Sequence, residues 1–123
     1  MKNCIVVLNA DPKQCNKFCD LLQNGQYSTT PVYSPQKLDE CIQECSCFAA
    51  FIDIDTIPID NRWVRELTIK YPDTNFFCLS EQSFHPEIKD AICYHIYACI
   101  KKPVDPDEIF YWLRSIEENE TDH

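Results

Sequence analysis

Glycine is nearly absent from this chain, since Gly25 is the only one among 123 residues. Phosphate-binding loops of the mononucleotide and dinucleotide types need several glycines at fixed spacing, so the sequence excludes both. Basic residues are also few, because 11 Lys and Arg stand against 20 Asp and Glu, which gives a net charge of −9. This balance argues against direct nucleic-acid binding and against attraction to anionic lipid.

Long apolar runs are missing as well. No run approaches the roughly 18 residues that would span a membrane. The N-terminal residues 1–12 contain a short apolar run that Asn9 and Asp11 follow at once, which is typical of a strand rather than a secretion signal. We therefore expect a cytoplasmic protein without a membrane contact.

Cysteine is abundant, but the nine cysteines form no Cys-x-x-Cys motif. The odd count and the missing secretion signal argue against a disulfide framework. The densest group, Cys41, Cys45 and Cys47, lacks an evident fourth ligand, so its spacing disfavours a metal site. Most cysteines are instead expected where a small apolar residue would pack.

Short apolar runs alternate with helical patterns along the whole chain. We expect strands at 4–8, 27–33, 47–53, 75–80 and 96–100. Four of these runs are nearly continuous in apolar residues, which indicates strands covered on both faces, as in a parallel sheet. The run at 27–33 is weaker and contains Pro31, which suits an edge strand.

Helices are expected between the strands and after the last one. Asp11-Pro12, Ser34-Pro35 and Asp105-Pro106 each place a good N-cap before a proline at the first helical position. Weaker helical patterns lie near 60–70 and 85–94. Strands that alternate with helices predict an α/β fold with a doubly wound, five-stranded parallel sheet and helices on both faces.

Polar side chains follow the predicted strands. The carboxyl ends of parallel strands meet at one edge of such a sheet, where ligands bind. Three of these ends carry Asp53 and Asp55, Ser80 and Glu81, and Lys101 and Lys102, so a carboxylate, a hydroxyl and an ammonium form a set suited to phosphoryl chemistry. The carboxylate is the nucleophile or metal ligand, and the hydroxyl and ammonium stabilise charge on phosphoryl oxygens. Asp11 precedes a proline, which favours a helix cap over a catalytic carboxylate.

The segments that carry these residues resemble the receiver domains of response regulators in bacterial two-component signalling. The resemblance covers about residues 3–118 and rests on FIDIDTIPIDN, FFCLS and CIKKPVDPDEI. It implies the flavodoxin-like receiver fold with strand order 2-1-3-4-5. We expect a receiver domain at 1–119, followed by a disordered acidic tail at 120–123.

The resemblance also implies roles for individual residues. Asp53 matches the phospho-accepting aspartate, and Ser80 and Lys102 match the hydroxyl and lysine that coordinate the phosphoryl group and act as the switch. The Lys102–Pro103 peptide bond is implied to be cis, an isomer common only before proline. Tyr97 is a candidate switch aromatic, displaced by two residues from the family's position.

The sequence departs from the family at the metal site. The family has two adjacent acids after the first strand, and Asn9 and Ala10 occupy those positions here. The metal ligands would then be Asp53 and Asn9, with Asp55 as a replacement carboxylate. Because Mg²⁺ requires oxygen ligands in near-octahedral geometry, we expect weak or absent Mg²⁺ binding. No organic cofactor is implied.

Three smaller departures accompany this one. Pro58 lies five residues after Asp53, where the family has four. The family's glycine before the last strand is replaced near His95, for which a left-handed conformation is expected. Glu81 is expected either to pair with Lys102 or to repel an incoming phosphoryl group.

Two functions remain open at this stage, and neither makes the chain an enzyme. The first is a phosphorelay receiver that accepts a phosphoryl group on Asp53 from a sensor histidine kinase or phosphotransfer protein and then switches its C-terminal face. The second is a degenerate receiver that acts as a phosphate-independent protein-interaction module, which Asn9-Ala10 favours. A flavodoxin-like FMN protein would need a Ser/Thr-rich loop, and NADPKQC is not one.

A partner surface is expected on the C-terminal part of the chain. Aromatic residues are frequent in the C-terminal part of the chain, at Phe84, Tyr94, Tyr97 and residues 110–112. More aromatic residues than the core needs would form an exposed apolar patch around the fourth and fifth helices. The alternative is that they are core residues and scattered surface residues. We expect a downstream partner or a homodimer to form through that face.

Overall fold

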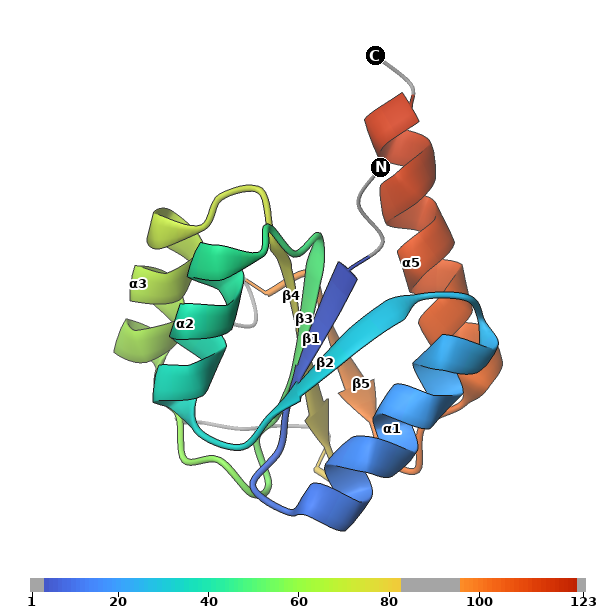
Figure 1. Ribbon diagram of the computed structural model, residues 1–123. Coiled ribbons are helices and arrows are strands. Elements are labelled where there is room, and N and C mark those ends of the chain that lie inside the picture. The colour runs from blue at the N-terminus through green and yellow to red at the C-terminus, as the bar shows by residue number, and fades with distance from the viewer. Residues whose placement is uncertain (1–3, 83–95, 122–123) are drawn as a thin grey trace.

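The computed structural model describes residues 4–82 and 96–121 (Figure 1). The strands are β1 (Cys4–Leu8), β2 (Ser28–Val32), β3 (Ala49–Asp53), β4 (Asn75–Ser80) and β5 (Ala98–Lys101). The helices are α1 (Pro12–Asn24), α2 (Pro35–Glu44), α3 (Asn61–Lys70) and α5 (Pro106–Thr121). The helix expected near 85–94, the left-handed conformation expected at His95, and the aromatics Phe84 and Tyr94 lie outside the described residues.

The five strands form one sheet in the order β2-β1-β3-β4-β5, and every pairing is parallel. This confirms the predicted fold class and strand order. β2 is an edge strand, where Pro31 pairs in register with Val7. Because all strands run in the same direction, their carboxyl ends share one edge of the sheet, at the bottom of Figure 1.

Helices cover both faces of the sheet (Figure 1). Alternate strand residues point to opposite faces, so the sheet has two cores. The core under α2 and α3 includes Val6, Leu8, Leu38, Val64 and Phe76. The core under α1 and α5 includes Phe18, Phe51, Phe77, Ile109 and Leu113. The ring of Phe51 stacks on that of Phe77, with 4.7 Å between ring centroids, so β3 and β4 are fixed beside each other directly behind the strand ends.

Side-chain caps set the first turns of the helices. Asp11, Ser34 and Asp60 each accept a backbone N–H from the turn that follows. Asp105 does the same at the start of α5. Such caps satisfy donors that a helix leaves unpaired at its N-terminus. Asp11 is therefore the helix cap that the sequence favoured, and it fixes where α1 begins after β1.

The turn after α1 contains Gly25, the only glycine in the sequence. Gly25 has an ordinary φ of −89°, whereas Gln26 adopts the left-handed φ of 70°. A Cβ on Gly25 would lie 2.3 Å from Cε1 of Phe110 on α5. Glycine is therefore required here for close packing of α1 against α5, and the strained backbone conformation falls on the next residue.

The last helix continues past the predicted end of the domain. α5 runs to Thr121, two residues into the segment 120–123 for which we expected disorder. Of the helices described, none is both long and apolar enough to cross a bilayer.

Candidate functional site

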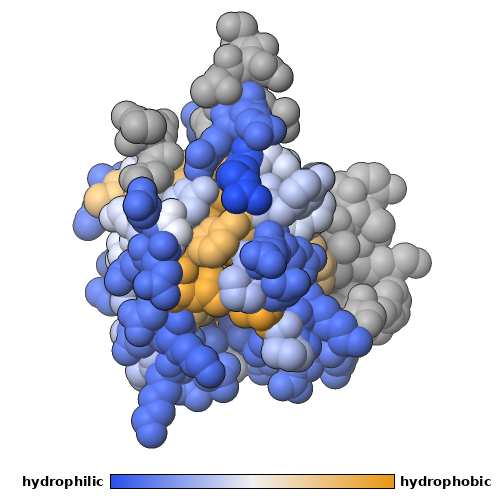
Figure 2. Space-filling view, turned by 90° about the vertical axis from the view of Figure 1, so that its right-hand side faces the viewer, coloured by the Kyte–Doolittle hydropathy of each residue, from blue (hydrophilic) through white to orange (hydrophobic). Residues whose placement is uncertain are grey.

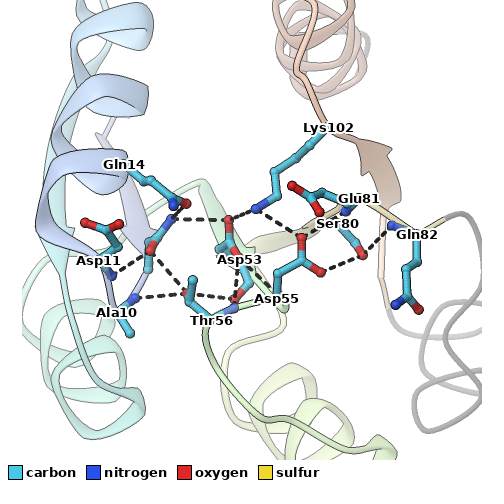
Figure 3. Close-up of polar contacts among 11 residues, drawn as sticks. Ala10, Asp11, Gln14, Asp53, Asp55, Thr56, Ser80, Glu81, Gln82 and Lys102 are labelled. Atoms are coloured by element: carbon cyan, nitrogen blue, oxygen red, sulfur yellow. Dashed lines mark hydrogen bonds and ion pairs between the residues drawn. The ribbon is translucent and has the colours of Figure 1, made fainter.

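The strand-end residues predicted from the sequence lie together at the carboxyl edge of the sheet. Asp53 ends β3 and is only 2% exposed, and Ser80 ends β4 and is fully buried. Lys102 follows β5 directly, and its peptide bond to Pro103 is cis. Figure 3 shows Asp53 between the β1–α1 turn on one side and Asp55, Ser80 and Lys102 on the other.

The Asp53 carboxylate is contacted by donors on both oxygens. Its Oδ1 accepts the backbone N–H groups of Asp55 and Thr56, at 3.0 and 3.1 Å. Its Oδ2 lies 2.6 Å from Lys102 Nζ and accepts a hydrogen bond from Asn9 Nδ2 at 3.2 Å. Four donors therefore contact the two oxygens of this carboxylate.

The orientation of Asn9 is determined by its own neighbours. Asn9 is 4% exposed, and its Oδ1 accepts the Asp11 backbone N–H at 2.8 Å and the Thr56 hydroxyl at 3.1 Å. With the oxygen engaged in this way, the amide nitrogen faces Asp53 and also donates to Gln14 Oε1 at 3.3 Å. Asn9 consequently presents a donor, and not an oxygen ligand, to the central carboxylate.

Asp55 turns toward the β4 and β5 side of the site. Its Oδ1 accepts a hydrogen bond from Ser80 Oγ at 3.0 Å, and its Oδ2 accepts one from the Glu81 backbone N–H at 2.9 Å. Lys102 Nζ lies 3.1 Å from the same Oδ2. Ser80 and Lys102 are therefore linked to each other through the carboxylate of Asp55 (Figure 3).

These contacts change the proton affinities of the charged groups. Burial raises the pKa of Asp55, but the hydrogen bonds from Glu81, Lys102 and Ser80 outweigh it and hold that pKa below its ordinary value. Burial lowers the pKa of Lys102, but the carboxylates of Asp53 and Asp55 outweigh it and raise that pKa. Both groups are therefore charged at neutral pH.

The donor set at this edge does not fit the divalent cation that the receiver fold implies. Mg²⁺ requires oxygen ligands, but Asn9 directs an N–H at Oδ2 of Asp53. Asp55, the replacement ligand considered from the sequence, directs its oxygens at Ser80, Glu81 and Lys102 instead. Among residues 4–82 and 96–121, no three His, Cys, Asp or Glu side chains are grouped so that they could hold a metal ion.

Tyr97 lies apart from this cluster. Its ring packs on Phe77, with centroids 5.3 Å apart, and edge-on against Trp112 at 5.7 Å. The ring of Tyr111 meets Trp112 at 5.4 Å. Tyr97 and Tyr111 are 38% and 58% exposed, so an aromatic surface lies at the residue before β5 and on α5, on the described part of the face expected from the sequence.

An apolar groove opens beside Asp53, between α1 and the loop that follows β5. It has a volume of about 310 Å³, its apolar lining includes Phe18, Leu21, Pro103 and Val104, and Asp53 is also among its lining residues. Figure 2 shows this side of the molecule, with apolar side chains gathered at the centre of the face that α1 and α5 form.

Two contributors to the site have no counterpart among the residues predicted from the sequence. Thr56 accepts the Ala10 backbone N–H at 3.0 Å and donates to Asn9, which joins the β1–α1 turn to the loop after β3. Gln14 contacts Asn9 from the first turn of α1. The hydroxyl of Thr56, three residues past Asp53, is a signal that sequence analysis could have used.

No protein-family model and no curated protein matches the chain, but solved structures do. The signal receiver domain of an HD domain-containing protein from Pseudomonas fluorescens Pf-5 has 17% identity and a TM-score of 0.85, with 100% of both chains covered. A CheY-like response regulator receiver domain protein from Methanospirillum hungatei JF-1 has 14% identity and a TM-score of 0.85, again over 100% of both chains.

The chemotaxis response regulator CheY4 of Vibrio cholerae has 12% identity and a TM-score of 0.77, with 94% of this chain and 99% of that chain covered. Identities this low establish a shared fold, and the function has to be argued from the site. The chain has the fold of the CheY-like response regulator receiver domains, as its sequence predicted.

Proposed function

We propose that the protein is a receiver-type signalling module that acts by binding a protein partner, without metal-dependent phosphorylation of Asp53. The observation that carries this proposal is the hydrogen bond from Asn9 Nδ2 to Asp53 Oδ2, at 3.2 Å. The amide stands where the receiver pattern has an acid, and it presents a proton where a cation would need an oxygen. The degenerate-receiver hypothesis thus has a structural basis.

The charges around Asp53 support the same proposal. The carboxylates of Asp53 and Asp55 both contact Lys102 Nζ, and among the described residues this is the one ammonium that contacts both. A phosphodonor that approaches Asp53 would meet two carboxylates and a single ammonium, whose charge both carboxylates already share, so little of it offsets the charge that develops on the phosphoryl oxygens. Phosphoryl transfer would therefore be slow.

The partner surface in this proposal is the aromatic one formed by Tyr97, which directly precedes β5, and by Tyr111 and Trp112 on α5. Tyr97, Tyr111 and Trp112 form a continuous set of edge-on ring contacts, and two of the rings are well exposed. Exposed Tyr and Trp side chains supply large contact areas at protein interfaces. Because the chain carries a net charge of −9, a partner with a basic rim around an apolar centre fits this surface best.

Intact-protein mass spectrometry tests the proposal. The protein is incubated with a small-molecule phosphodonor, with and without Mg²⁺, beside a receiver known to be labelled. The matched variant carries Asn9→Asp and Ala10→Asp, which restores the acidic pair. We expect no addition to the wild-type chain and a Mg²⁺-dependent phosphoryl group on the variant. A Mg²⁺-dependent, base-labile addition to the wild type that Asp53→Ala abolishes would refute the proposal.

Phosphorylation of Asp53 is the second candidate function. It is favoured by the contact of 2.6 Å between Lys102 Nζ and Asp53 Oδ2, because an ammonium beside a buried carboxylate can also hold a phosphoryl oxygen. A sensor histidine kinase or phosphotransfer protein would then be the partner. The wild-type sample in the mass experiment decides between the two functions.

A further inference from the structure

Two cysteines that lie outside the candidate site are in contact at the amino edge of the sheet. Cys4 begins β1, and Cys47 lies in the loop between α2 and β3. Their Sγ atoms are 3.6 Å apart. Asp53 lies at the opposite edge of the sheet, where the strands end (Figure 1). This thiol pair is therefore separate from the residues on which the proposed function rests.

The backbone on either side keeps the two sulfurs together. β1 pairs with β3, and the Phe48 N–H donates to the Cys4 carbonyl at 3.1 Å. The Thr74 hydroxyl donates to the Cys47 carbonyl at 2.7 Å. Because a disulfide has an S–S distance of about 2.05 Å, the sulfurs would have to approach each other by about 1.5 Å. Small rotations of the two side chains cover that distance without a change in the sheet.

The two thiols differ in exposure and in hydrogen bonding. Cys4 is partly exposed, whereas Cys47 is buried. Cys47 Sγ donates to the Cys45 carbonyl at 3.1 Å, which leaves its lone pairs for Cys4. Burial and the neighbouring thiols of Cys4 and Cys41 raise the pKa of Cys47, so it stays protonated at neutral pH. An oxidant in solution therefore reaches Cys4 and not Cys47, and Cys47 is placed to react with the oxidised Cys4.

We propose that Cys4 and Cys47 form a peroxide-sensitive modification site that closes to an intramolecular disulfide. The oxidant class is a hydroperoxide, of which hydrogen peroxide is the simplest. Cys4 Sγ loses its proton to solvent and attacks one peroxide oxygen; the O–O bond breaks, and the hydroxide that leaves takes up a proton to become water. The product is a sulfenic acid on Cys4.

The buried thiol completes the reaction. Cys47 Sγ attacks Cys4 Sγ, the S–O bond of the sulfenic acid breaks, and the hydroxide leaves as water with the proton of Cys47. The two thiols together lose two electrons and become one disulfide, while hydrogen peroxide is reduced to two molecules of water. In a reducing compartment such a bond is transient, which suits a modification that follows a signal and not a structural crosslink.

Peptide mapping by mass spectrometry tests the proposal. The reduced wild-type protein is treated with hydrogen peroxide at low protein concentration, its remaining thiols are alkylated, and the monomeric chain is digested with trypsin without reduction. Cys4 is then on residues 3–13, and Cys41, Cys45 and Cys47 are together on residues 38–62. We expect these two peptides to be joined and to be separated by dithiothreitol. Peptides that stay unlinked while Cys4 is oxidised to a sulfinic or sulfonic acid would overturn the proposal.

Single variants identify the sulfur that pairs with Cys4. Cys41 is the alternative partner because its thiol also interacts with Cys4 and Cys47. Cys47→Ala should lose the link between the two peptides, whereas the matched controls Cys41→Ser and Cys45→Ser should keep it. A link that survives in Cys47→Ala, or that disappears in either control, overturns the proposal.

Thermal unfolding keeps the proposal testable if Cys47→Ala does not fold. A Cys4–Cys47 bond closes a loop across a sequence separation of 43 residues, which constrains the unfolded chain. Peroxide should therefore raise the unfolding midpoint of the wild type by roughly 5–10 °C, reversibly with dithiothreitol, and leave Cys4→Ser unchanged. A wild-type midpoint that does not rise, or an equal rise in Cys4→Ser, overturns the proposal. No phosphodonor or metal ion is present, so the outcome is independent of the proposed function.

Discussion

The free energy of unfolding of the Asn9→Asp variant tests the contacts around Asp53. Asn9 Nδ2 donates to Asp53 Oδ2 at 3.2 Å, and both residues are buried. In Asn9→Asp a carboxylate oxygen replaces this donor. Two unit charges at that distance repel by about 5 kcal/mol at an effective dielectric constant near 20.

The measured loss will be smaller than the gross repulsion. Lys102 Nζ, 2.6 Å from Asp53 Oδ2, offsets part of it, and the new carboxyl group can relieve more of it by taking up a proton. We therefore expect Asn9→Asp to lower the free energy of unfolding by about 2–3 kcal/mol, which is the penalty typical of a buried acceptor that loses its donor.

Urea unfolding at neutral pH measures this loss, with Asn16→Asp as the control because Asn16 is exposed on the same segment of chain. Millimolar Mg²⁺, compared with NaCl at equal ionic strength, should restore part of the stability of Asn9→Asp and leave the wild type unchanged. A variant as stable as the wild type without Mg²⁺, or a loss equal to that of the control, would refute the account of this contact.

Three further predictions concern the fold and the pH dependence. Gly25→Ala should lower the free energy of unfolding by about 1–3 kcal/mol, because its Cβ would lie 2.3 Å from Phe110. Gln26→Gly should raise it by up to about 1 kcal/mol, because Gln26 has a positive φ. Urea unfolding that gave the opposite signs would contradict both expectations. Phe51→Ala should cost about 3–5 kcal/mol in the same assay, and a loss under 1 kcal/mol would show that its stacked position is unimportant. The lowered pKa of Asp55 means that its charge stabilises the fold above the ordinary pKa of 3.8 and that this contribution is lost as the pH falls through the lower folded-state pKa. The deficit of Asp55→Asn should therefore be constant near neutral pH and shrink in acid, and a deficit that grew on acidification would contradict the direction of the shift.

Much of the fold could be predicted because local signals agree with one another. The apolar runs mark strands covered on both faces, and Asp11, Ser34 and Asp105 cap helices where a proline follows. The strand ends predicted a carboxylate, a hydroxyl and an ammonium at one edge of the sheet, and the resemblance to receiver domains selected Asp53, Ser80 and Lys102 among the residues there. The strand order needed the resemblance to receiver domains, since periodicity does not say which strands are neighbours.

What the sequence could not predict depends on contacts between distant segments. Gly25 is needed because the ring of Phe110 lies where its Cβ would be, whereas the left-handed conformation of the turn is at Gln26. The Asn9 amide faces Asp53 with its nitrogen because Thr56 and the Asp11 backbone engage its oxygen. Asp55 turns toward Ser80 because Ser80 Oγ, the Glu81 backbone N–H and Lys102 Nζ contact its oxygens.

Paramagnetic broadening by Mn²⁺ tests the central claim most directly. The claim is that hydrogen-bond donors of the protein occupy the Asp53 oxygens and so prevent a metal ion from binding there. A ¹⁵N-labelled sample is titrated with Mn²⁺, beside the variant that carries Asn9→Asp and Ala10→Asp. In the wild type, the amide resonances of Asp55 and Thr56, which donate to Asp53, should not broaden more than surface amides do. In the variant they should broaden first. Selective broadening of these two resonances in the wild type would contradict the account.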